Sequence, residues 1–138
     1  MGRQLRGFGV NILTPQISSY IEKLVSVLNF TVIRQDEAFA VLSWMPADQT
    51  NIDTIIMIHT DFTYAANPYS EYLTSLDMRG RGIELRFYHL DPDDAVARAK
   101  DAAGWTVLQE ATDKPHGLRE AFLLDDLGYC WVPSLPRK

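Results

Sequence analysis

The chain has 138 residues, 46% of them hydrophobic, which is the size and composition of one globular domain with a core of its own. Its 13 basic and 18 acidic residues give a net charge of −5, which disfavours nonspecific binding to nucleic acid and favours neutral or cationic partners. Cys130 is the only cysteine, and no apolar segment is long enough for a signal peptide or a membrane span, so the sequence predicts a cytoplasmic protein without an internal disulfide.

A strand followed by a helix is predicted near the start of the chain. Residues 7–13 alternate in polarity with the period of a half-buried strand, and Phe8, Val10 and Ile12 share one side of it. The pair Thr-Pro that ends at Pro15 predicts the start of the helix. The apolar stripe of this helix consists of Ile17, Ile21, Leu24 and Leu28. Three further strands are predicted at residues 31–35, 38–44 and 52–59.

The connector, residues 61–79, is rich in aromatic residues, which is unusual for an inert linker. A short helix is predicted within it, at residues 69–76. The same order of elements then recurs. Leu85 and Phe87 point to one side of a strand that begins near residue 82.

The opposite side of this strand carries an acid, a base and a phenol, from Glu84, Arg86 and Tyr88. Asp91 is predicted to cap the helix that follows, with Pro92 as its first residue. Because this helix covers the apolar side of the strand, the polar side is either solvated or lines a pocket. Three strands follow, near residues 105–110, 119–124 and 129–132.

Matching sequence landmarks support an internal duplication. Asn29-Phe30-Thr31 recurs as Gly104-Trp105-Thr106, and Glu37-Ala38-Phe39 recurs as Glu120-Ala121-Phe122, in the same order along the chain. The predicted fold is therefore α+β, with two strand-helix-strand-strand-strand (βαβββ) modules that form a curved mixed sheet around a cavity. The boundaries are module 6–60, connector 61–79 and module 80–134 within a single domain of residues 1–138. The residues predicted to be buried are Phe8, Val10, Ile12, Ile21, Leu24, Leu85, Phe87 and Val96.

The stretch Pro115-His116-Gly117-Leu118-Arg119-Glu120-Ala121-Phe122, followed by Asp125-Asp126-Leu127-Gly128-Tyr129, is the most specific part of the second module. It resembles the Pro-Trp-Gly-x-Arg-x-Phe stretch and the Asp-Pro-Asp-Gly-Asn turn of the vicinal oxygen chelate superfamily, which contains glyoxalases, dioxygenases and bleomycin resistance proteins. The resemblance covers nearly the whole chain. It implies a cavity that can hold a divalent metal through one residue from each of four strands.

Few of those ligands are present in this chain. The position on the first strand falls on Gly7 or Gly9, and the position on the last strand falls on Val132, none of which can coordinate a metal. Glu84 and, on the fourth strand, His59 are the residues that could serve. The sequence is therefore closest in pattern to the metal-free branch typified by bleomycin resistance proteins, and no cofactor is expected.

The predicted ligand-binding residues are Asn11, Trp44, His59, Glu84, Arg86, Tyr88 and Cys130. Five of them have a structural alternative: a solvated or ion-paired strand face for Glu84 and Arg86, a structural or surface role for His59, ordinary packing for Trp44, and a small buried hydrophobe for Cys130. No catalytic triad, phosphate loop or zinc spacing is present in the sequence.

Two hypotheses for the function follow from the resemblance. The first is a cytoplasmic homodimer that sequesters a hydrophobic or cationic, antibiotic-like small molecule without a metal, and that binds neither nucleic acid nor membranes. The alternative is a lyase, isomerase or dioxygenase of the same superfamily, with Glu84 and His59 in metal or proton chemistry. The identity of the ligand cannot be read from the residues.

Overall fold

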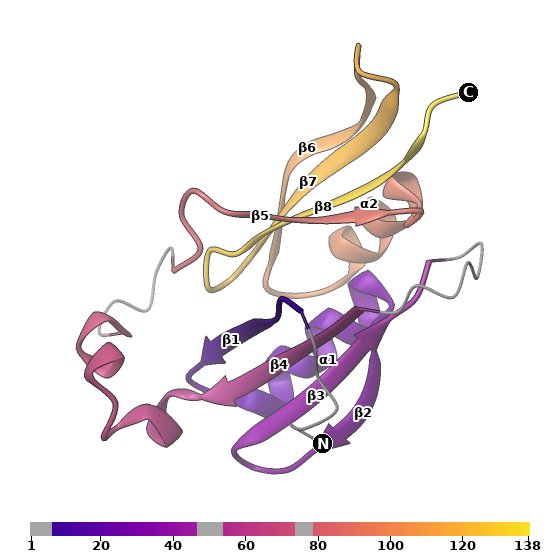
Figure 1. Ribbon diagram of the computed structural model, residues 1–138. Coiled ribbons are helices and arrows are strands. Elements are labelled where there is room, and N and C mark those ends of the chain that lie inside the picture. The colour runs from indigo at the N-terminus through magenta and orange to yellow at the C-terminus, as the bar shows by residue number, and fades with distance from the viewer. Residues whose placement is uncertain (1–6, 47–53, 74–78) are drawn as a thin grey trace.

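The computed structural model describes residues 7–46, 54–73 and 79–138. Two units of identical order, each a strand, a helix and three strands, follow one another along this part of the chain (Figure 1). Each unit has its own four-stranded sheet. The fold class is α+β with two βαβββ modules, as the sequence predicts.

Module 1 is the indigo-to-magenta half of Figure 1. Its elements are β1 (Val10–Thr14), α1 (Ile17–Leu28), β2 (Thr31–Gln35), β3 (Phe39–Trp44) and β4 (Thr54–Thr60). The sheet order is β1-β4-β3-β2, with β1 parallel to β4 and the other pairs antiparallel. The connector follows as two 3-10 turns, Asp61–Tyr64 and Pro68–Leu73.

Module 2 repeats this plan in the orange-to-yellow half. Its elements are β5 (Glu84–Tyr88), α2 (Pro92–Asp101), β6 (Trp105–Asp113), β7 (Leu118–Asp125) and β8 (Cys130–Pro136). The sheet order is β5-β8-β7-β6, again with one parallel pair, β5 and β8. Since β1 and β5 occupy the same place in the two sheets, the duplication seen in the sequence is also present in the topology.

The two helices begin differently. The carboxylate of Asp91 accepts hydrogen bonds from the backbone N–H groups of Asp93 and Asp94, which are the orphan donors that a helix cap satisfies, and Pro92 takes the first turn. α1 begins after Gln16 without a side-chain cap, two residues beyond Pro15. At its end Asn29 has a φ of 63°, the left-handed conformation expected of this residue.

The modules share one hydrophobic core. Phe87 of β5 packs against Phe30 and Trp44 of module 1, with ring centroids 5.6 and 5.0 Å apart, and stacks on Trp131 of β8 at 5.9 Å. We call these four residues, Phe30, Trp44, Phe87 and Trp131, the aromatic cluster. All are buried. Burial of this much aromatic area between the modules stabilises their packing in one arrangement.

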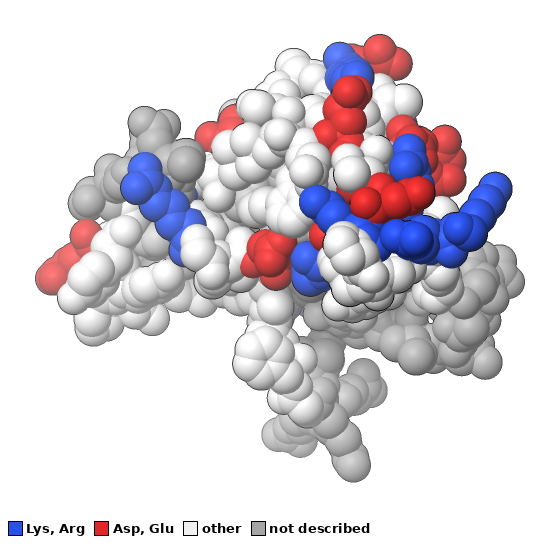
Figure 2. Space-filling model, turned by 90° about the horizontal axis from the view of Figure 1, so that it is seen from above, with Lys and Arg blue, Asp and Glu red and all other residues white. Residues whose placement is uncertain are grey.

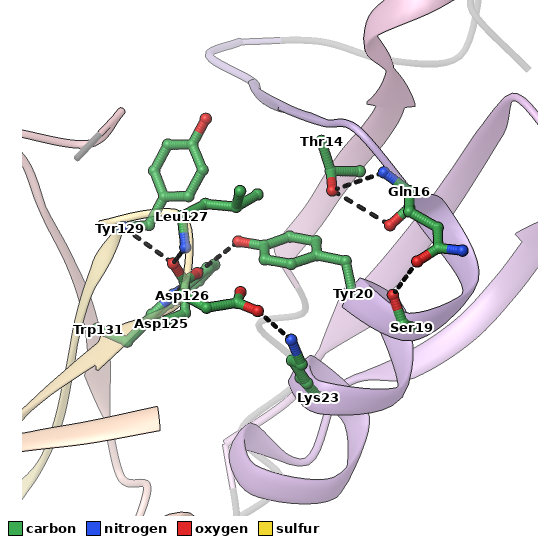
Figure 3. A network of polar contacts seen from close by, with 10 residues as sticks. All are labelled: Thr14, Gln16, Ser19, Tyr20, Lys23, Asp125, Asp126, Leu127, Tyr129 and Trp131. Atoms are coloured by element: carbon green, nitrogen blue, oxygen red, sulfur yellow. Dashed lines mark hydrogen bonds and ion pairs between the residues drawn. The ribbon is translucent and has the colours of Figure 1, made fainter. Parts of the chain in front are cut away.

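A buried polar contact also joins the modules. Tyr20 on α1 donates a hydrogen bond to Asp125 at the end of β7, and the neighbouring Lys23 forms an ion pair with Asp126 (Figure 3). Asp125 additionally accepts from the indole N–H of Trp131. The turn after β7 is therefore held against α1 by hydrogen bonds and charge as well as by apolar contact.

The core prediction is confirmed for Ile12, Ile21, Leu24, Phe87 and Val96, while Val10 and Leu85 are half-buried. It is wrong for Phe8, whose side chain is 95% exposed. β1 begins at Val10, where pairing with β4 begins, and Gly7 has a φ of 82° that is incompatible with an extended strand. Among the described residues, no helix is long and apolar enough to cross a membrane.

Candidate ligand cavity

A cavity of about 510 Å³ opens between the two modules. This volume lies within the 300–1,000 Å³ range of typical small-molecule sites. The lining residues are Val10, Phe30, Trp44, Pro46, Thr54, Ile56, Leu85, Arg86, Phe87, Tyr88, His89 and Trp131. Because each module supplies half of them, the cavity exists only when the modules are packed together.

The aromatic cluster gives the cavity its chemistry. Trp44 donates its indole N–H to the carbonyl oxygen of Leu28 at 2.9 Å, and Trp131 donates to Asp125 at 2.9 Å. Since both indole donors are already satisfied within the protein, the rings present apolar surface to the cavity. Such a wall favours a flat, apolar molecule.

The polar side of the cavity is formed by consecutive residues of β5 and the turn after it. Arg86 pairs with Glu84 at 3.2 Å and with the buried carboxylate of Glu120. Burial alone would lower the pKa of the Arg86 guanidinium, but the hydrogen bond and the charge of Glu120, with smaller contributions from Tyr88 and Glu84, together outweigh burial and raise this pKa. Arg86 therefore stays charged, but the carboxylates of Glu84 and Glu120 offset its charge, so it adds little net attraction for an anionic ligand.

His89, next along the chain from Tyr88, has a φ of 71°, which is uncommon for a residue other than glycine. Its backbone N–H, like that of Leu90, donates to the carbonyl oxygen of Ser134. These bonds hold the strained turn in place. His89 is one of the residues that line the cavity at this turn.

The seven predicted ligand-binding residues divide into three places. Trp44, Arg86 and Tyr88 line the cavity, together with neighbours that the sequence did not single out. Glu84 on β5 and Cys130 on β8 are register partners. By strand alternation Glu84 lies on the same face of the sheet as Arg86, opposite to the face of Leu85. Burial, with a smaller contribution from the charge of Glu84, raises the pKa of the Cys130 thiol.

The remaining two, Asn11 and His59, lie together on module 1. Asn11 Oδ1 is 2.6 Å from His59 Nδ1, and Asn11 Nδ2 donates to the Tyr64 hydroxyl at 2.8 Å. Asn11 alternates along β1 with Val10, and His59 alternates along β4 with Ile58 of the core. This cluster is thus on the opposite face of the sheet from the cavity.

Charged side chains on module 2 are largely paired with one another. Seen from above, acidic and basic side chains lie next to each other on one part of the surface, and much of the remainder is uncharged (Figure 2). Arg119 bridges Asp93 at 2.8 Å and Asp113 at 3.2 Å, and Lys100 pairs with Glu110. This face therefore offers no uniform patch for a polyanion or polycation.

No protein-family model and no curated protein sequence matches the chain. Several solved structures, in contrast, superpose on the chain. A glyoxalase/bleomycin resistance protein/dioxygenase family enzyme from Burkholderia phytofirmans PsJN superposes with a TM-score of 0.71 and 19% identity, over 93% of this chain and 96% of the other. A glyoxalase/bleomycin resistance protein/dioxygenase from Nocardioides gives 0.66 and 15%, over 97% and 86%. TioX from Micromonospora sp. ML1 gives 0.61 and 19%, over 96% and 98%.

The chain has the glyoxalase/bleomycin resistance fold. This fold agrees with the superfamily resemblance drawn from residues 115–122 and from the turn at residues 125–129. The sequence identities to these structures are too low to transfer a function. The metal-ligand positions that the sequence resemblance implies fall on Gly7 or Gly9, which precede β1, on Glu84 and Val132, and on His59 of β4. No group of three or more His, Cys, Asp or Glu residues in the described ranges is arranged to hold a metal ion.

The cavity residues that the sequence analysis missed are mainly apolar. Phe30 and Ile56 come from module 1, and Leu85 and Phe87 were assigned only to the packing beneath α2. Period-two alternation identifies the inward face of each strand, but it cannot show that the inward faces of two modules leave a gap between them. No signal in the sequence would have located that gap.

Proposed function

We propose that the protein binds a flat, largely apolar small molecule, uncharged or cationic, in the cavity between its modules, and that it sequesters this ligand without a metal. The observation that carries the proposal is the 510 Å³ cavity walled by the aromatic cluster. Bleomycin resistance appears in the family description of two structures with the same fold, which supports an antibiotic-like ligand.

The electrostatics favour an uncharged or cationic ligand over an anion. Arg86 is neutralised by Glu84 and Glu120, so no unpaired Lys or Arg side chain is among the described residues that line the cavity. The net charge of the chain is −5, and the faces of Trp44 and Trp131 can attract a cation within about 6 Å.

The direct test is isothermal titration calorimetry with planar probes of different charge: 9-aminoacridine as a cation and 1-anilinonaphthalene-8-sulfonate as an anion. We expect the cation to bind more tightly. Leu85→Trp should fill the cavity and abolish binding, whereas Ile83→Trp, at the exposed residue just before β5 and outside the cavity, should leave it unchanged. Equal binding by both variants would show that the ligand binds elsewhere.

An enzyme of the same superfamily is the second candidate. The observation that favours it is His59, whose imidazole is held by Asn11 as catalytic imidazoles are commonly held by a neighbouring polar side chain. Elemental analysis and a thermal shift with divalent ions separate the two candidates. A stoichiometric metal that raises the melting temperature would favour the enzyme.

We further propose that the protein acts as a cytoplasmic homodimer. β1 and β5 are each paired on one side only among the described strands, and exposed apolar residues, Phe8 and Ile83, precede them. Open strand edges next to apolar side chains are surfaces that proteins commonly cover by association. A two-fold dimer is the most common way to do so.

A further inference from the structure

One edge of β5 forms part of the cavity wall. The cavity is lined by consecutive residues, 85–89, of β5 and the turn after it. Because the side chains of a strand alternate between the two faces of its sheet, a cavity against one face alone would contact only every second residue. The consecutive residues therefore place the cavity along the edge of β5. β5 is the outer strand of its sheet, and β8 is its only neighbour among the described strands.

Two hydrogen bonds show which backbone groups of β5 point toward β8. The N–H of His89 donates to the carbonyl oxygen of Ser134 at 2.9 Å, and the carbonyl oxygen of Phe87 accepts from the Ser134 hydroxyl at 2.7 Å. In a parallel ladder the N–H and C=O of one residue point to the same neighbouring strand, and those of the next residue point to the opposite side. The backbone groups of Arg86 and Tyr88 therefore point away from β8, to the open edge.

These groups place an acceptor and a donor next to each other. The carbonyl oxygen of Arg86 and the N–H of Tyr88 are neighbours on the open edge, because only Phe87 lies between them and its own groups point toward β8. No described residue forms a backbone hydrogen bond with β5 on this side. Backbone groups at such an edge bind a partner that offers the complementary donor and acceptor. In an otherwise apolar cavity, groups of this kind fix the orientation of a ligand.

The aromatic cluster lies directly beside this edge. Phe87 packs against Trp44 with ring centroids 5.0 Å apart. A flat ring held against the cluster can therefore direct its own polar edge to β5. The side chain of Arg86 is not required for this contact, since Glu84 and Glu120 already engage the guanidinium.

We propose that the cavity selects flat, uncharged heteroaromatic molecules that carry a hydrogen-bond donor and an acceptor on adjacent positions, such as lactams. The donor of the ligand binds the carbonyl oxygen of Arg86, and its acceptor binds the N–H of Tyr88. This inference rests on the proposed function of the cavity and adds the chemical class of its ligand. Recognition is by backbone groups at the edge of β5 rather than by side chains on a face of the sheet.

The first experiment compares 2-quinolone with coumarin by isothermal titration calorimetry. The two molecules share a fused-ring shape and a carbonyl acceptor, and the N–H of 2-quinolone is replaced by a ring oxygen in coumarin. We expect 2-quinolone to bind at least about fivefold more tightly, the effect of one net hydrogen bond.

The outcomes separate this proposal from the proposed function. Equal affinities, or no binding of 2-quinolone while 9-aminoacridine shifts the indole NMR signal of Trp44, would overturn this proposal alone. If no probe shifts the Trp44 signal, the cavity is not a ligand site, and both proposals are overturned.

The second experiment locates the contact by NMR. In the wild-type protein, 2-quinolone should shift the carbonyl ¹³C signal of Arg86 and the amide proton of Tyr88, whereas coumarin should leave the Arg86 carbonyl unshifted. Tyr88→Pro removes the N–H at an edge position, where proline is tolerated, and should weaken 2-quinolone binding at least about fivefold relative to Tyr88→Ala, which keeps the N–H. If Tyr88→Pro does not fold, the two shifts of the wild-type protein decide. Binding of 2-quinolone without these shifts would overturn the proposal.

A second copy of the chain is the competing occupant of this edge. We expect 2-quinolone to bind equally to the wild-type protein and to a variant with Phe8→Lys and Ile83→Lys, whose exposed positions lie outside the cavity and place charge beside the strand edges. Binding by this variant but not by the wild-type protein would assign the edge of β5 to association, and would overturn the proposal.

Discussion

The hydroxyl of Tyr20 on α1 donates a hydrogen bond of 2.6 Å to Oδ2 of Asp125, at the end of β7 in the other module (Figure 3). The same oxygen accepts from Trp131, and Oδ1 accepts from the backbone N–H groups of Leu127 and Tyr129 at 3.0 Å. Burial raises the pKa of Asp125, an effect that these hydrogen bonds oppose. One carboxylate therefore satisfies four donors and holds the turn of module 2 against the helix of module 1.

Replacement of Asp125 by Ala is expected to lower the free energy of unfolding by about 2–4 kcal/mol, because it leaves buried donors without an acceptor. Tyr20→Phe should cost about 1 kcal/mol. Urea unfolding of both variants and of the double variant gives their coupling. The matched control is Asp126→Ala, which removes only a more exposed ion pair with Lys23 and should change stability by less than about 1 kcal/mol. Equal losses for Asp125→Ala and Asp126→Ala would contradict this interpretation.

This pair also shows where prediction from the sequence stops. The stripe of α1 was predicted correctly at Ile17, Ile21, Leu24 and Leu28, because helical periodicity is local. Tyr20 and Asp125 are 105 residues apart, and no local pattern relates them. The fold could be predicted because it is a repeated unit with local signals, whereas the cavity could not, since it depends on how Phe30 and Trp44 meet Phe87.

Local signals also failed at one end of a strand. Phe8 has the parity of Val10 and Ile12, but it lies outside β1 and is exposed. The glycines on either side of it weaken a strand, and alternation alone does not measure that cost. Parity likewise placed Leu85 and Phe87 beneath α2 without showing that both also line the space between the modules.

The caps of the two helices predict different sensitivities. Asp91→Ala removes an acceptor from two backbone donors of α2 and is expected to lower the free energy of unfolding by about 1 kcal/mol. Gln16→Ala, at the equivalent position of α1, removes no such hydrogen bond and should change stability by less than about 0.5 kcal/mol. Thermal unfolding of the two variants checks this. Similar losses would mean that the Asp91 cap contributes little.

Arg79 anchors the connector. Its guanidinium donates to both oxygens of Asp61, at 2.9 and 2.7 Å, and to the carbonyl oxygens of Leu13 and Leu73. The hydrogen bond to Asp61, against the opposing effect of burial, raises the pKa of Arg79. Arg79→Met should cost about 2–3 kcal/mol, less than the loss of a fully buried pair, because the Asp61 side chain is 27% exposed. If Arg79→Met and Asp61→Asn in urea titrations are strictly additive, the pair is not coupled.

His59 predicts a pH dependence of stability. Burial lowers its pKa in the folded protein below the value of about 6.5 expected in the unfolded chain. The unfolded state therefore binds the proton more readily, so this contribution to stability is present above about pH 6.5 and is lost as the pH falls through the folded pKa. His59→Gln should lose less stability than the wild-type protein between pH 7.5 and pH 5. An NMR titration midpoint for His59 at or above 6.5 would contradict the expectation.

The open edges of β1 and β5 predict the assembly state. If a second copy covers them, light scattering at micromolar concentration should give the mass of two chains. Phe8→Lys combined with Ile83→Lys places charge beside both edges and should give monomers. These monomers should still be folded, because both side chains are exposed in the single chain. Leu108→Lys on β6, at the other edge of the module 2 sheet and also exposed, is the matched control and should leave the dimer intact. A monomeric wild-type protein would exclude the dimer, and dissociation by Leu108→Lys alone would assign the interface to β6 instead.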